Sequence, residues 1–364
     1  MIVQDVINHL EKLAPLAYAE DFDNVGLLVG HKNAKLTGVL VTLDTLEAVV
    51  DEAIETNCNL IVSFHPIIFK GLKKITGKNY VERVVTKAIK NDIAIYSIHT
   101  ALDNALEGVN NMLCDTLELT NKHILIPQNK TIKKLITYVP KQEAEQLRTV
   151  LFNVGAGSIG NYNNCSFNVE GYGTFKGNEH SNPTKGKKGE IHTEYETKIT
   201  VTFPKHLESK IIKTLFDSHS YEDVAYEITT LENKNQNIGM GMVGELKEPL
   251  DELAFLRYLE RKMNTECIRH SKFLNKKIKK VAVLGGSGSF AINSAKASGA
   301  DAFITGDLKY HDFFTAGNTI LLADIGHYES EQFTKNLLVE YLTKKITNFA
   351  IILSNINTNP VKYF

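Results

Sequence analysis

The alternation of apolar strands and helices at both ends of this 364-residue chain most constrains its fold. Short apolar runs alternate with segments of helical spacing up to about residue 126, and the alternation returns after residue 237. Predicted helices include one capped by Asp44 and Thr45 and a long one from Glu331 to Lys344. Strands separated by helices of this length are typical of βαβ units with mostly parallel, buried sheets. The sequence therefore predicts an α/β core formed by both ends of the chain.

The middle of the chain has a different order of predicted strands and helices. Between about residues 132 and 231 the predicted elements are a strand, a helix, two strands, a helix and a strand. This β-α-β-β-α-β order is the ferredoxin-like arrangement. We therefore predict a discontinuous α/β core with a mostly parallel sheet or sheets, residues 1–128 and 236–364. An α+β ferredoxin-like domain, residues 129–235, interrupts it.

The composition indicates which partners and which cellular compartment to expect. The 41 Lys and Arg residues nearly balance the 42 Asp and Glu residues, so a nucleic-acid partner is not expected. The four cysteines are scattered without a C-x-x-C pair, which fits reduced thiols in the cytoplasm. No apolar run approaches the ~18 residues of a membrane span, so no membrane association is expected. We expect a cytoplasmic protein.

Potential metal ligands follow three of the predicted strands. His65 follows one strand, His99 and Asp103 follow the next, and His327 and Glu331 follow a third near the end of the chain. Ligands in open α/β sheets bind beyond the carboxyl ends of the strands, so these side chains are expected to meet. Asp, Glu and neutral His together suit Zn, Fe, Mn or Ni. The sequence therefore predicts one divalent-metal site assembled from both ends of the chain.

Other interpretations remain open for the same residues. A single histidine after a strand is more often an ordinary loop residue. Asp307 and His311 follow another strand, where they would form an outer shell or proton relay, or else cap a helix and lie on the surface. The run Gly285 to Ser289 resembles a phosphate-binding turn but lacks the G-x-G-x-x-G spacing, and its serines would equally cap the next helix.

Several segments together carry a family resemblance: Phe22 to Gly30, Ser63 to Phe69, His99 to Asp103, Thr305 to His311, and Gly326 to Glu331. They resemble the dinuclear-metal family named after the NGG-one interacting factor three, whose members are often labelled GTP cyclohydrolase type-two homologs. Segments of the middle domain resemble the PII-like, CutA-like lid of the longer bacterial members: Gly155 to Tyr162, Cys165 to Phe167, Gly171 to Phe175, and Ser220 to Tyr226. The resemblance covers essentially the whole chain.

The resemblance implies a ligand set. The family's two-metal site uses two adjacent histidines, an aspartate, and a histidine and glutamate near the end of the chain. His65, Asp103, His327 and Glu331 match four of these positions, whereas Phe64 replaces the first histidine of the pair. One of two ions must then lose a ligand, recruit another such as His99, or be absent. We therefore expect one or two divalent ions per subunit.

The resemblance also implies an activity and an assembly. We expect a metal-dependent hydrolase acting on a nucleotide or related small molecule, of which GTP cyclohydrolase chemistry is one case. His99 and His311 are the candidate catalytic residues that would relay protons. Family members form homohexameric toroids in which the inserted domains act as lids. The alternative is a non-catalytic regulatory hexamer that senses a metal or a small effector.

Overall fold

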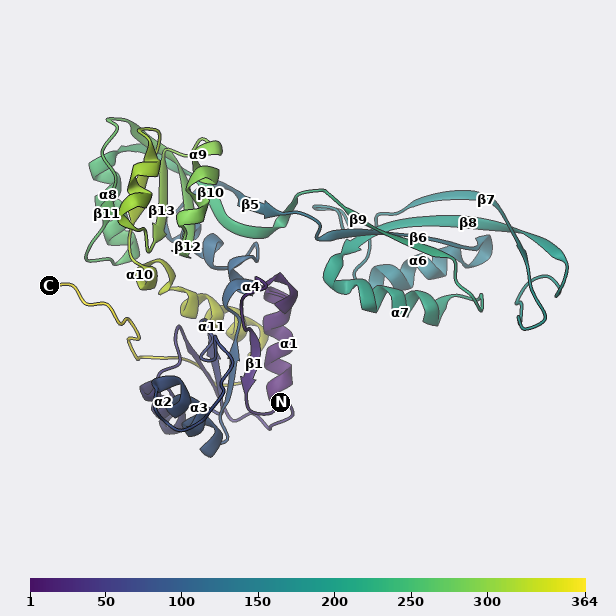
Figure 1. Ribbon diagram of the computed structural model, residues 1–364, viewed down its shortest axis with the longest axis horizontal. Helices are drawn as coiled ribbons and strands as arrows, with labels where there is room; N and C mark the ends of the chain where they lie inside the picture. The colour runs from purple at the N-terminus through teal and green to yellow at the C-terminus, as the bar shows by residue number, and fades with distance from the viewer. The chain divides into compact units, whose positions relative to one another are not determined.

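The chain folds into two compact units in the computed structural model, which describes residues 1–364. The first unit comprises Met1–Pro127 and Gln236–Phe364, and the second comprises Gln128–Asn235 (Figure 1). The fold is mixed α/β with three sheets. All of the residues predicted to form the metal site belong to the first unit.

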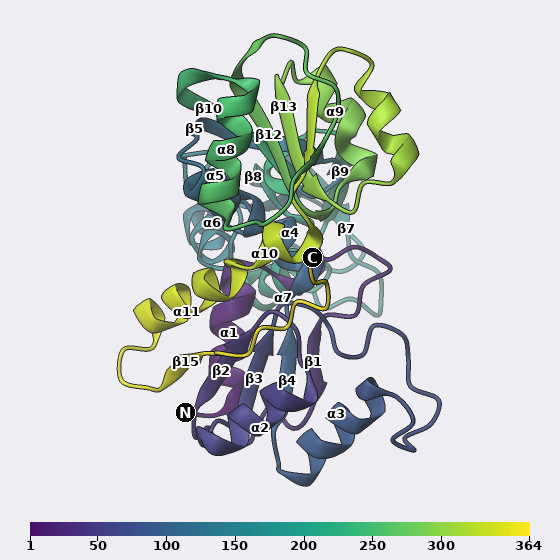
Figure 2. The same ribbon diagram turned by 90° about the vertical axis from the view of Figure 1, so that its left-hand side faces the viewer.

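The first sheet of this unit has the strand order β1-β4-β3-β2-β15 (Figure 2). The strands are β1 (Gly26–Val29), β2 (Val39–Thr42), β3 (Leu60–Ser63), β4 (Ala94–Ser97) and β15 (Ile351–Leu353). The pairings among β15, β2, β3 and β4 are parallel, and β1 joins β4 antiparallel at one edge. Strands β2, β3 and β4 are buried along their whole length, as expected for a sheet covered on both faces.

Helices explain why both faces of this sheet are apolar. Alternate strand residues such as Ile61 pack with α2 (Glu47–Glu55) and α3 (Tyr80–Lys90). The intervening residues, such as Val62, pack with α1 (Val3–Leu13) and α11 (Thr334–Lys345). The apolar stripes of α1 and α3 face these clusters. Alternate strand residues on each face of the sheet therefore pack against the apolar side of a helix.

The second sheet has the order β11-β14-β13-β12-β10-β5. Its strands are β5 (Thr120–Gln128), β10 (Asn235–Asp251), β11 (Arg269–His270), β12 (Lys277–Ser287), β13 (Ala302–Gly306) and β14 (Leu321–Asp324). Strands β12, β13 and β14 are parallel, whereas β10 and β11 pair antiparallel with β12 and β14. A single apolar cluster contains residues of both sheets, so the two sheets share one core.

The remaining helical segments of the first unit precede or connect these strands. They are η1 (Leu16–Tyr18), α4 (His99–Asp103), α5 (Val109–Thr116), α8 (Glu252–Met263), η4 (Ser289–Ala291), α9 (Ile292–Ala297), η5 (Tyr310–Ala316) and α10 (His327–Glu331). The short helices α4 and α10 each follow a buried parallel strand. No helix of the structure has both the length and the apolarity needed to cross a lipid bilayer.

The second unit has the element order β-α-β-β-α-β. Its elements are β6 (Ile132–Pro140), η2 (Lys141–Glu143), α6 (Ala144–Asn153), β7 (Phe167–Lys176), β8 (Ile191–Pro204), η3 (Lys205–Leu207), α7 (Glu208–Ser218) and β9 (Tyr226–Leu231). The sheet order is β7-β8-β6-β9, and every neighbouring pair is antiparallel. Residues of α6 and α7 form a separate core with β6 and β8.

Two local predictions differ from the structure. Helix α2 begins after Leu46 rather than after an Asp44 or Thr45 cap, because the Asp44 carboxylate is bonded to His65. The predicted helix from Glu331 to Lys344 is two helices, and Glu331 ends the first.

The structure also bears on the resemblance of Gly285 to Ser289 to a phosphate-binding turn. Gly285 and Gly286 lie inside the longer strand β12. Their backbone N–H groups donate to Asn110 Oδ1 and Ser330 Oγ, at 3.1 and 2.9 Å. These N–H groups are therefore already used within the protein.

Candidate metal centre

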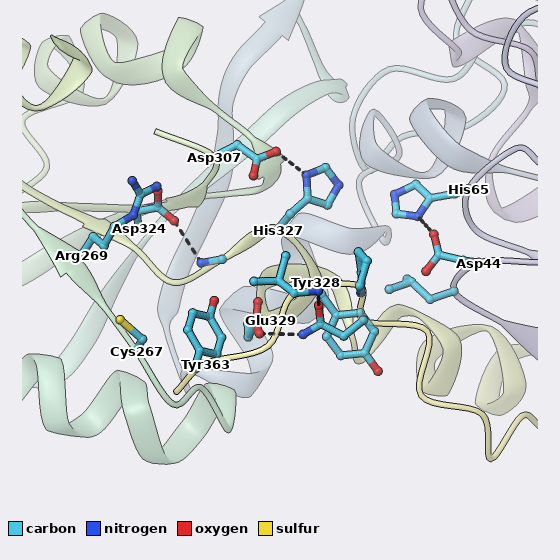
Figure 3. A pocket seen from close by; sticks show the side chains of 15 residues that line it. Asp44, His65, Cys267, Arg269, Asp307, Asp324, His327, Tyr328, Glu329 and Tyr363 are labelled. Atoms are coloured by element: carbon cyan, nitrogen blue, oxygen red, sulfur yellow. Dashed lines mark hydrogen bonds and ion pairs between the residues drawn. The ribbon is translucent and has the colours of Figure 1, made fainter. Parts of the chain in front are cut away.

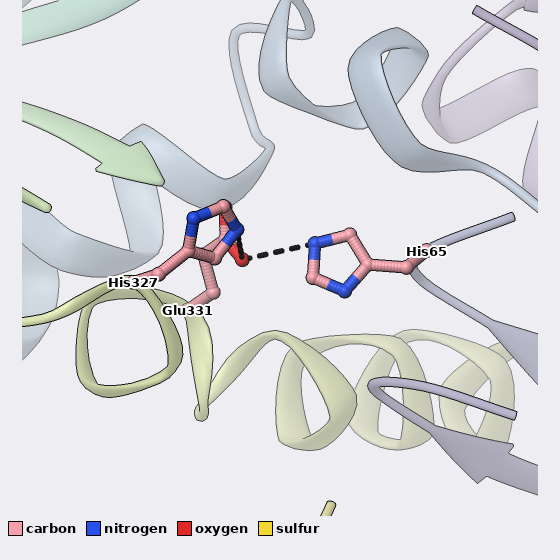
Figure 4. Close-up of side chains that lie close together, drawn as sticks. All are labelled: His65, His327 and Glu331. Atoms are coloured by element: carbon pink, nitrogen blue, oxygen red, sulfur yellow. Dashed lines mark ion pairs between the residues drawn. The ribbon is translucent and has the colours of Figure 1, made fainter. Parts of the chain in front are cut away.

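Three side chains from distant parts of the chain converge on one point. The Nε2 atoms of His65 and His327 lie 3.1 and 3.2 Å from Oε2 of Glu331. One potential ligand atom from each residue lies within 4.8 Å of the other two. Figure 4 shows the two imidazoles on either side of the Glu331 carboxylate. This is the clustering that the sequence predicted for these three residues.

The structure around Glu331 tests whether a divalent ion fits. The Glu331 side chain is 3% exposed, and Oε2 has no hydrogen-bond partner despite the two nearby nitrogens. A buried carboxylate oxygen without a donor is costly. Ligand atoms about 2.1 Å from a shared ion lie roughly 3 Å apart, which matches the observed spacing. Two histidines and one carboxylate suit Zn, Fe, Mn or Ni, so the donor set fits such an ion.

Local structure fixes the direction of each ligand. His65 follows β3, and its backbone N–H donates to Leu43 O at 2.9 Å while its carbonyl accepts from Ser63 Oγ. His327 and Glu331 are the first and last residues of α10, one helical turn apart. Gly326, immediately before α10, has φ of +93°, and a Cβ there would lie 2.1 Å from Glu329 Oε2. The entry to α10 therefore requires glycine.

Each histidine near the cluster has Nδ1 bonded to an aspartate, which leaves Nε2 as the outward atom. The three pairs are His65–Asp44 at 2.8 Å, His327–Asp307 at 2.6 Å and His99–Asp23 at 2.9 Å. Carboxylates in this position fix the orientation of a ligating imidazole and make it more basic. Asp307 is thus bonded to the candidate ligand His327, which agrees with its interpretation as a residue of the outer shell. The partnerships of Asp44 and Asp23 have no local sequence signal.

The charges of the cluster are strongly coupled. Burial lowers the pKa of His65, but contacts with Asp44 and Glu331 outweigh it and raise this pKa to about 10. Burial also lowers the pKa of His327, but contacts with Glu331 and Asp307 outweigh it and raise this pKa to about 9. Burial raises the pKa of Glu331, whereas the neighbouring imidazoles lower it to about 2. Without a metal, the two histidines are therefore cations held by a carboxylate at neutral pH.

Metal binding at this site is expected to release protons. A histidine must be neutral to ligate, and the raised pKa values mean that both histidines carry their protons below about pH 9. At pH 7 we expect about two protons released per ion, and an apparent affinity that rises with pH toward 9. Titration calorimetry in buffers of different ionisation enthalpy measures this number. A release of none at pH 7 would contradict the assignment of both histidines as ligands.

His99 and Asp103 lie next to the cluster without joining its three-atom core. They are the first and last residues of α4, and the ring centroids of His99 and His65 are 5.1 Å apart. Oδ1 of Asp103 is buried without a hydrogen-bond partner. Burial first, and then the charge of Glu331, raises the pKa of Asp103 well above its usual value. His99 and Asp103 therefore border the cluster, but neither belongs to the group of three converging ligand atoms.

Phe64 occupies the position where the family resemblance calls for a histidine. Its side chain is fully buried within the main apolar cluster. The ring centroid lies 4.9 Å from that of His65 and 5.5 Å from that of His99. An apolar ring therefore borders the place between the two imidazoles that a further ligand would occupy.

The structure does not bring His311 to this cluster. His311 is exposed on η5, where its ring contacts Tyr310 and Phe314. The spacing of Asp307 and His311 suggested that both served the site, but η5 begins at Tyr310 and turns the chain away after Asp307. Asp307, with φ of +57°, keeps its contact with His327.

A cavity of about 390 Å³ opens beside the cluster (Figure 3). His65 and Asp44 lie on one side of it and Arg269, Asp324 and Cys267 on the other, with His327 between them. The carboxyl-terminal segment supplies further lining residues: Asn359, Pro360, Val361 and Tyr363. A small molecule in this cavity would therefore reach the histidine cluster. The sequence reasoning missed Cys267, Arg269 and Tyr363, which stand outside any recognisable motif.

Known proteins resemble this chain over nearly its whole length. The family model for Duf34/NIF3 (NGG1p interacting factor 3) matches residues 1–360. The chain is 38% identical to the "GTP cyclohydrolase 1 type 2 homolog" of Bacillus subtilis, over 99% of this chain and 98% of that protein. It is 36% identical to the protein of the same name from Staphylococcus epidermidis, over the whole of both chains.

Solved structures show the same similarity. A Bacillus cereus protein related to NIF3 is 36% identical and superposes with a TM-score of 0.86, over 100% of this chain and 99% of that one. A Staphylococcus aureus protein is 31% identical, with a TM-score of 0.80 over the same shares of the two chains.

Proposed function

The chain belongs to the Duf34/NIF3 family, and on that premise we propose that it is a metal-dependent hydrolase acting on a nucleotide or related small molecule. The observation that carries this proposal is the convergence of His65 and His327 on a buried Glu331 oxygen that accepts no hydrogen bond, beside a cavity. The names of the relatives make hydrolytic opening of a purine ring one case of this activity.

Each residue of the cluster has a proposed role. His65, His327 and Glu331 would hold a divalent ion, which supplies Lewis-acid polarisation and lowers the pKa of water bound to it. Asp44 and Asp307 hold the two imidazoles by Nδ1, so that each Nε2 faces Glu331 and would be available as a ligand.

A proton relay would come from the neighbouring helix α4. His99 is bonded to Asp23 through Nδ1, which leaves its Nε2 free to accept or deliver a proton. Asp103, whose buried Oδ1 has no hydrogen-bond partner, would complete the ligand set. His311 takes no part, since it lies outside the cluster.

The lining of the cavity indicates which part of a substrate enters it. Its volume falls within the ~300–1,000 Å³ typical of small-molecule sites. Arg269 is its single Lys or Arg side chain and is already paired with Asp324. The carboxylates of Asp44, Asp307 and Glu329 also line it. With His65 and His327 engaged by the proposed ion, the remaining acids of the lining outnumber the single arginine, which favours an uncharged ring, such as a purine or cyclic amide, with any phosphate lying outside.

A substrate screen tests the proposed activity. Metal-loaded protein is expected to turn over at least one compound from a panel of nucleosides, nucleotides, phosphoesters and cyclic amides. His327→Ala is expected to abolish this turnover, whereas the matched His311→Ala is expected to keep it. Turnover that survives both chelation and His327→Ala would contradict the proposal.

A second candidate function is regulatory. The inserted unit has the ferredoxin-like element order and a cavity of its own. We propose that it acts as a PII-like lid on a homohexamer and that, if the chain is not a catalyst, this hexamer senses a metal or small effector. Light scattering is expected to give six chains per particle. A metal-loaded hexamer that binds small molecules saturably but turns over nothing in the screen would favour sensing over hydrolysis.

A further inference from the structure

The second unit contains a cavity of about 460 Å³ that is independent of the metal cluster. Its lining comes from the end of β7, the loop after it, Tyr138 of β6, Glu196 of β8, and the turn between α7 and β9. The loop is tied to that turn, because Asn182 N–H donates to Glu222 Oε2 at 2.6 Å and Thr184 Oγ1 donates to Ser220 O at 2.8 Å. The cavity is therefore enclosed by ordered chain on several sides.

A buried acid lies in the wall of this cavity. Glu196 is only 9% exposed, and its Oε1 accepts a hydrogen bond from the Tyr221 hydroxyl at 2.8 Å. Its other oxygen, Oε2, accepts no hydrogen bond from the protein and is open to solvent. A carboxylate taken out of water needs a donor or a cation to offset the loss of hydration. Within this mostly buried carboxyl group, Oε2 is the oxygen left open to a ligand in the cavity.

The backbone makes room for this arrangement. A Cβ at Gly173 on β7 would lie 2.1 Å from Glu196 Oε2 and 2.7 Å from Cδ. Only a residue without a side chain at position 173 allows the carboxylate its present position. Gly173 therefore leaves the space that the Glu196 carboxylate occupies.

Aromatic rings stand beside the acid. Tyr138, Phe175 and Tyr221 line the cavity, and the ring centroids of Phe175 and Tyr221 are 5.8 Å apart. The faces of such rings attract organic cations, and the attraction grows where water is excluded. Glu222 and Asp223 add negative charge to the lining, whereas Lys176 and Lys185 add positive charge. The acids outnumber the lysines, and the buried member of the set is an acid.

We propose that this cavity is a binding site for a small organic cation, an ammonium or guanidinium compound, with Glu196 as the anchoring carboxylate. The cationic group donates to Glu196 Oε2, while Tyr221 holds Oε1 and Phe175 covers the apolar part of the ligand. The site lies wholly within the inserted unit, so it stands whether or not the metal cluster is catalytic.

Binding of simple probes by the full-length protein tests this site. Butylammonium and butylguanidinium are titrated by calorimetry or ligand-observed NMR, with 1-butanol as the uncharged probe of similar size. The cations are expected to bind saturably and the alcohol not. Glu196→Gln preserves shape but removes the charge, and is expected to weaken binding of the cations about 30-fold or more, the factor for loss of one buried charge pair.

Two further variants make the result specific. Glu194→Gln removes the same charge two residues away on β8, where the carboxylate is bonded to His192 and does not line the cavity, and should leave affinity within about twofold of wild type. Gly173→Ala keeps every charge but displaces Oε2, and should weaken binding as Glu196→Gln does. Equal affinity of wild type and Glu196→Gln, or no saturable binding of either cation below about 10 mM, would overturn the proposal.

Discussion

Glu331→Gln is expected to remove tightly bound divalent metal from the protein, together with metal-dependent turnover. Glu331 supplies the one oxygen that both imidazoles face, and its side chain is almost fully buried. Loss of an outer partner alone costs about 10- to 100-fold in metal affinity, so loss of this ligand should cost at least 100-fold. Stabilisation by added metal, worth about 2.7 kcal/mol at a hundred times the dissociation constant, should disappear with it. Thermal denaturation with and without metal measures this.

The matched control is Glu340→Gln on α11, where an exposed carboxylate pairs only with Lys344. This variant should keep both bound metal and the thermal shift of wild type. Elemental analysis after gel filtration reports the metal content of each protein. Retention of the metal by Glu331→Gln would show that the ion lies elsewhere.

Phe64→His is expected to raise the number of tightly held ions from one to two per chain. Under the proposed assignment, one ion in the wild type would have His65, His327 and Glu331, whereas a second would have only His99 and Asp103 beside an apolar ring. Affinity follows the number and geometry of ligands, so the second ion should be lost on mild chelation. An imidazole at position 64 supplies the missing donor. Elemental analysis after mild chelation gives the count.

The same substitution should destabilise the metal-free protein. Phe64 is fully buried, so replacing it with a smaller, polar ring should cost about 2–4 kcal/mol in the free energy of unfolding. Phe303→His, at a fully buried position in β13 away from the histidines, controls for this cost and should not change the metal count. Two firmly held ions in the wild type would refute the role given to Phe64 and imply that another side chain replaces the family's histidine.

The sequence could predict the elements that carry the ligands because their signals are local. The buried runs before His65, His99 and His327 are apolar on both faces, and such runs are readable without knowledge of their neighbours. The spacing of His327 and Glu331 likewise needs only the geometry of one helical turn. The alternation of strands and helices along the chain did not specify how the strands divide between two sheets. Strand pairing depends on contacts between residues that are far apart in the sequence.

The supporting partners of the ligands could not be predicted for the same reason. Asp23 and His99 are 76 residues apart, and Asp44 and His65 are 21 residues apart. Local rules assigned Asp44 to a helix cap, yet the imidazole of His65 takes its carboxylate instead. His311 shows the opposite error, because a suggestive spacing after a strand placed it near the site although η5 holds it on the surface.

Anomalous X-ray diffraction from crystals grown with zinc tests the central claim most directly. The measurement locates the ion without relying on activity or on any substitution. The predicted result is an anomalous peak about 2.0–2.2 Å from His65 Nε2, His327 Nε2 and a Glu331 carboxylate oxygen. A zinc peak bound elsewhere, with these three side chains left in contact only with one another, would contradict it.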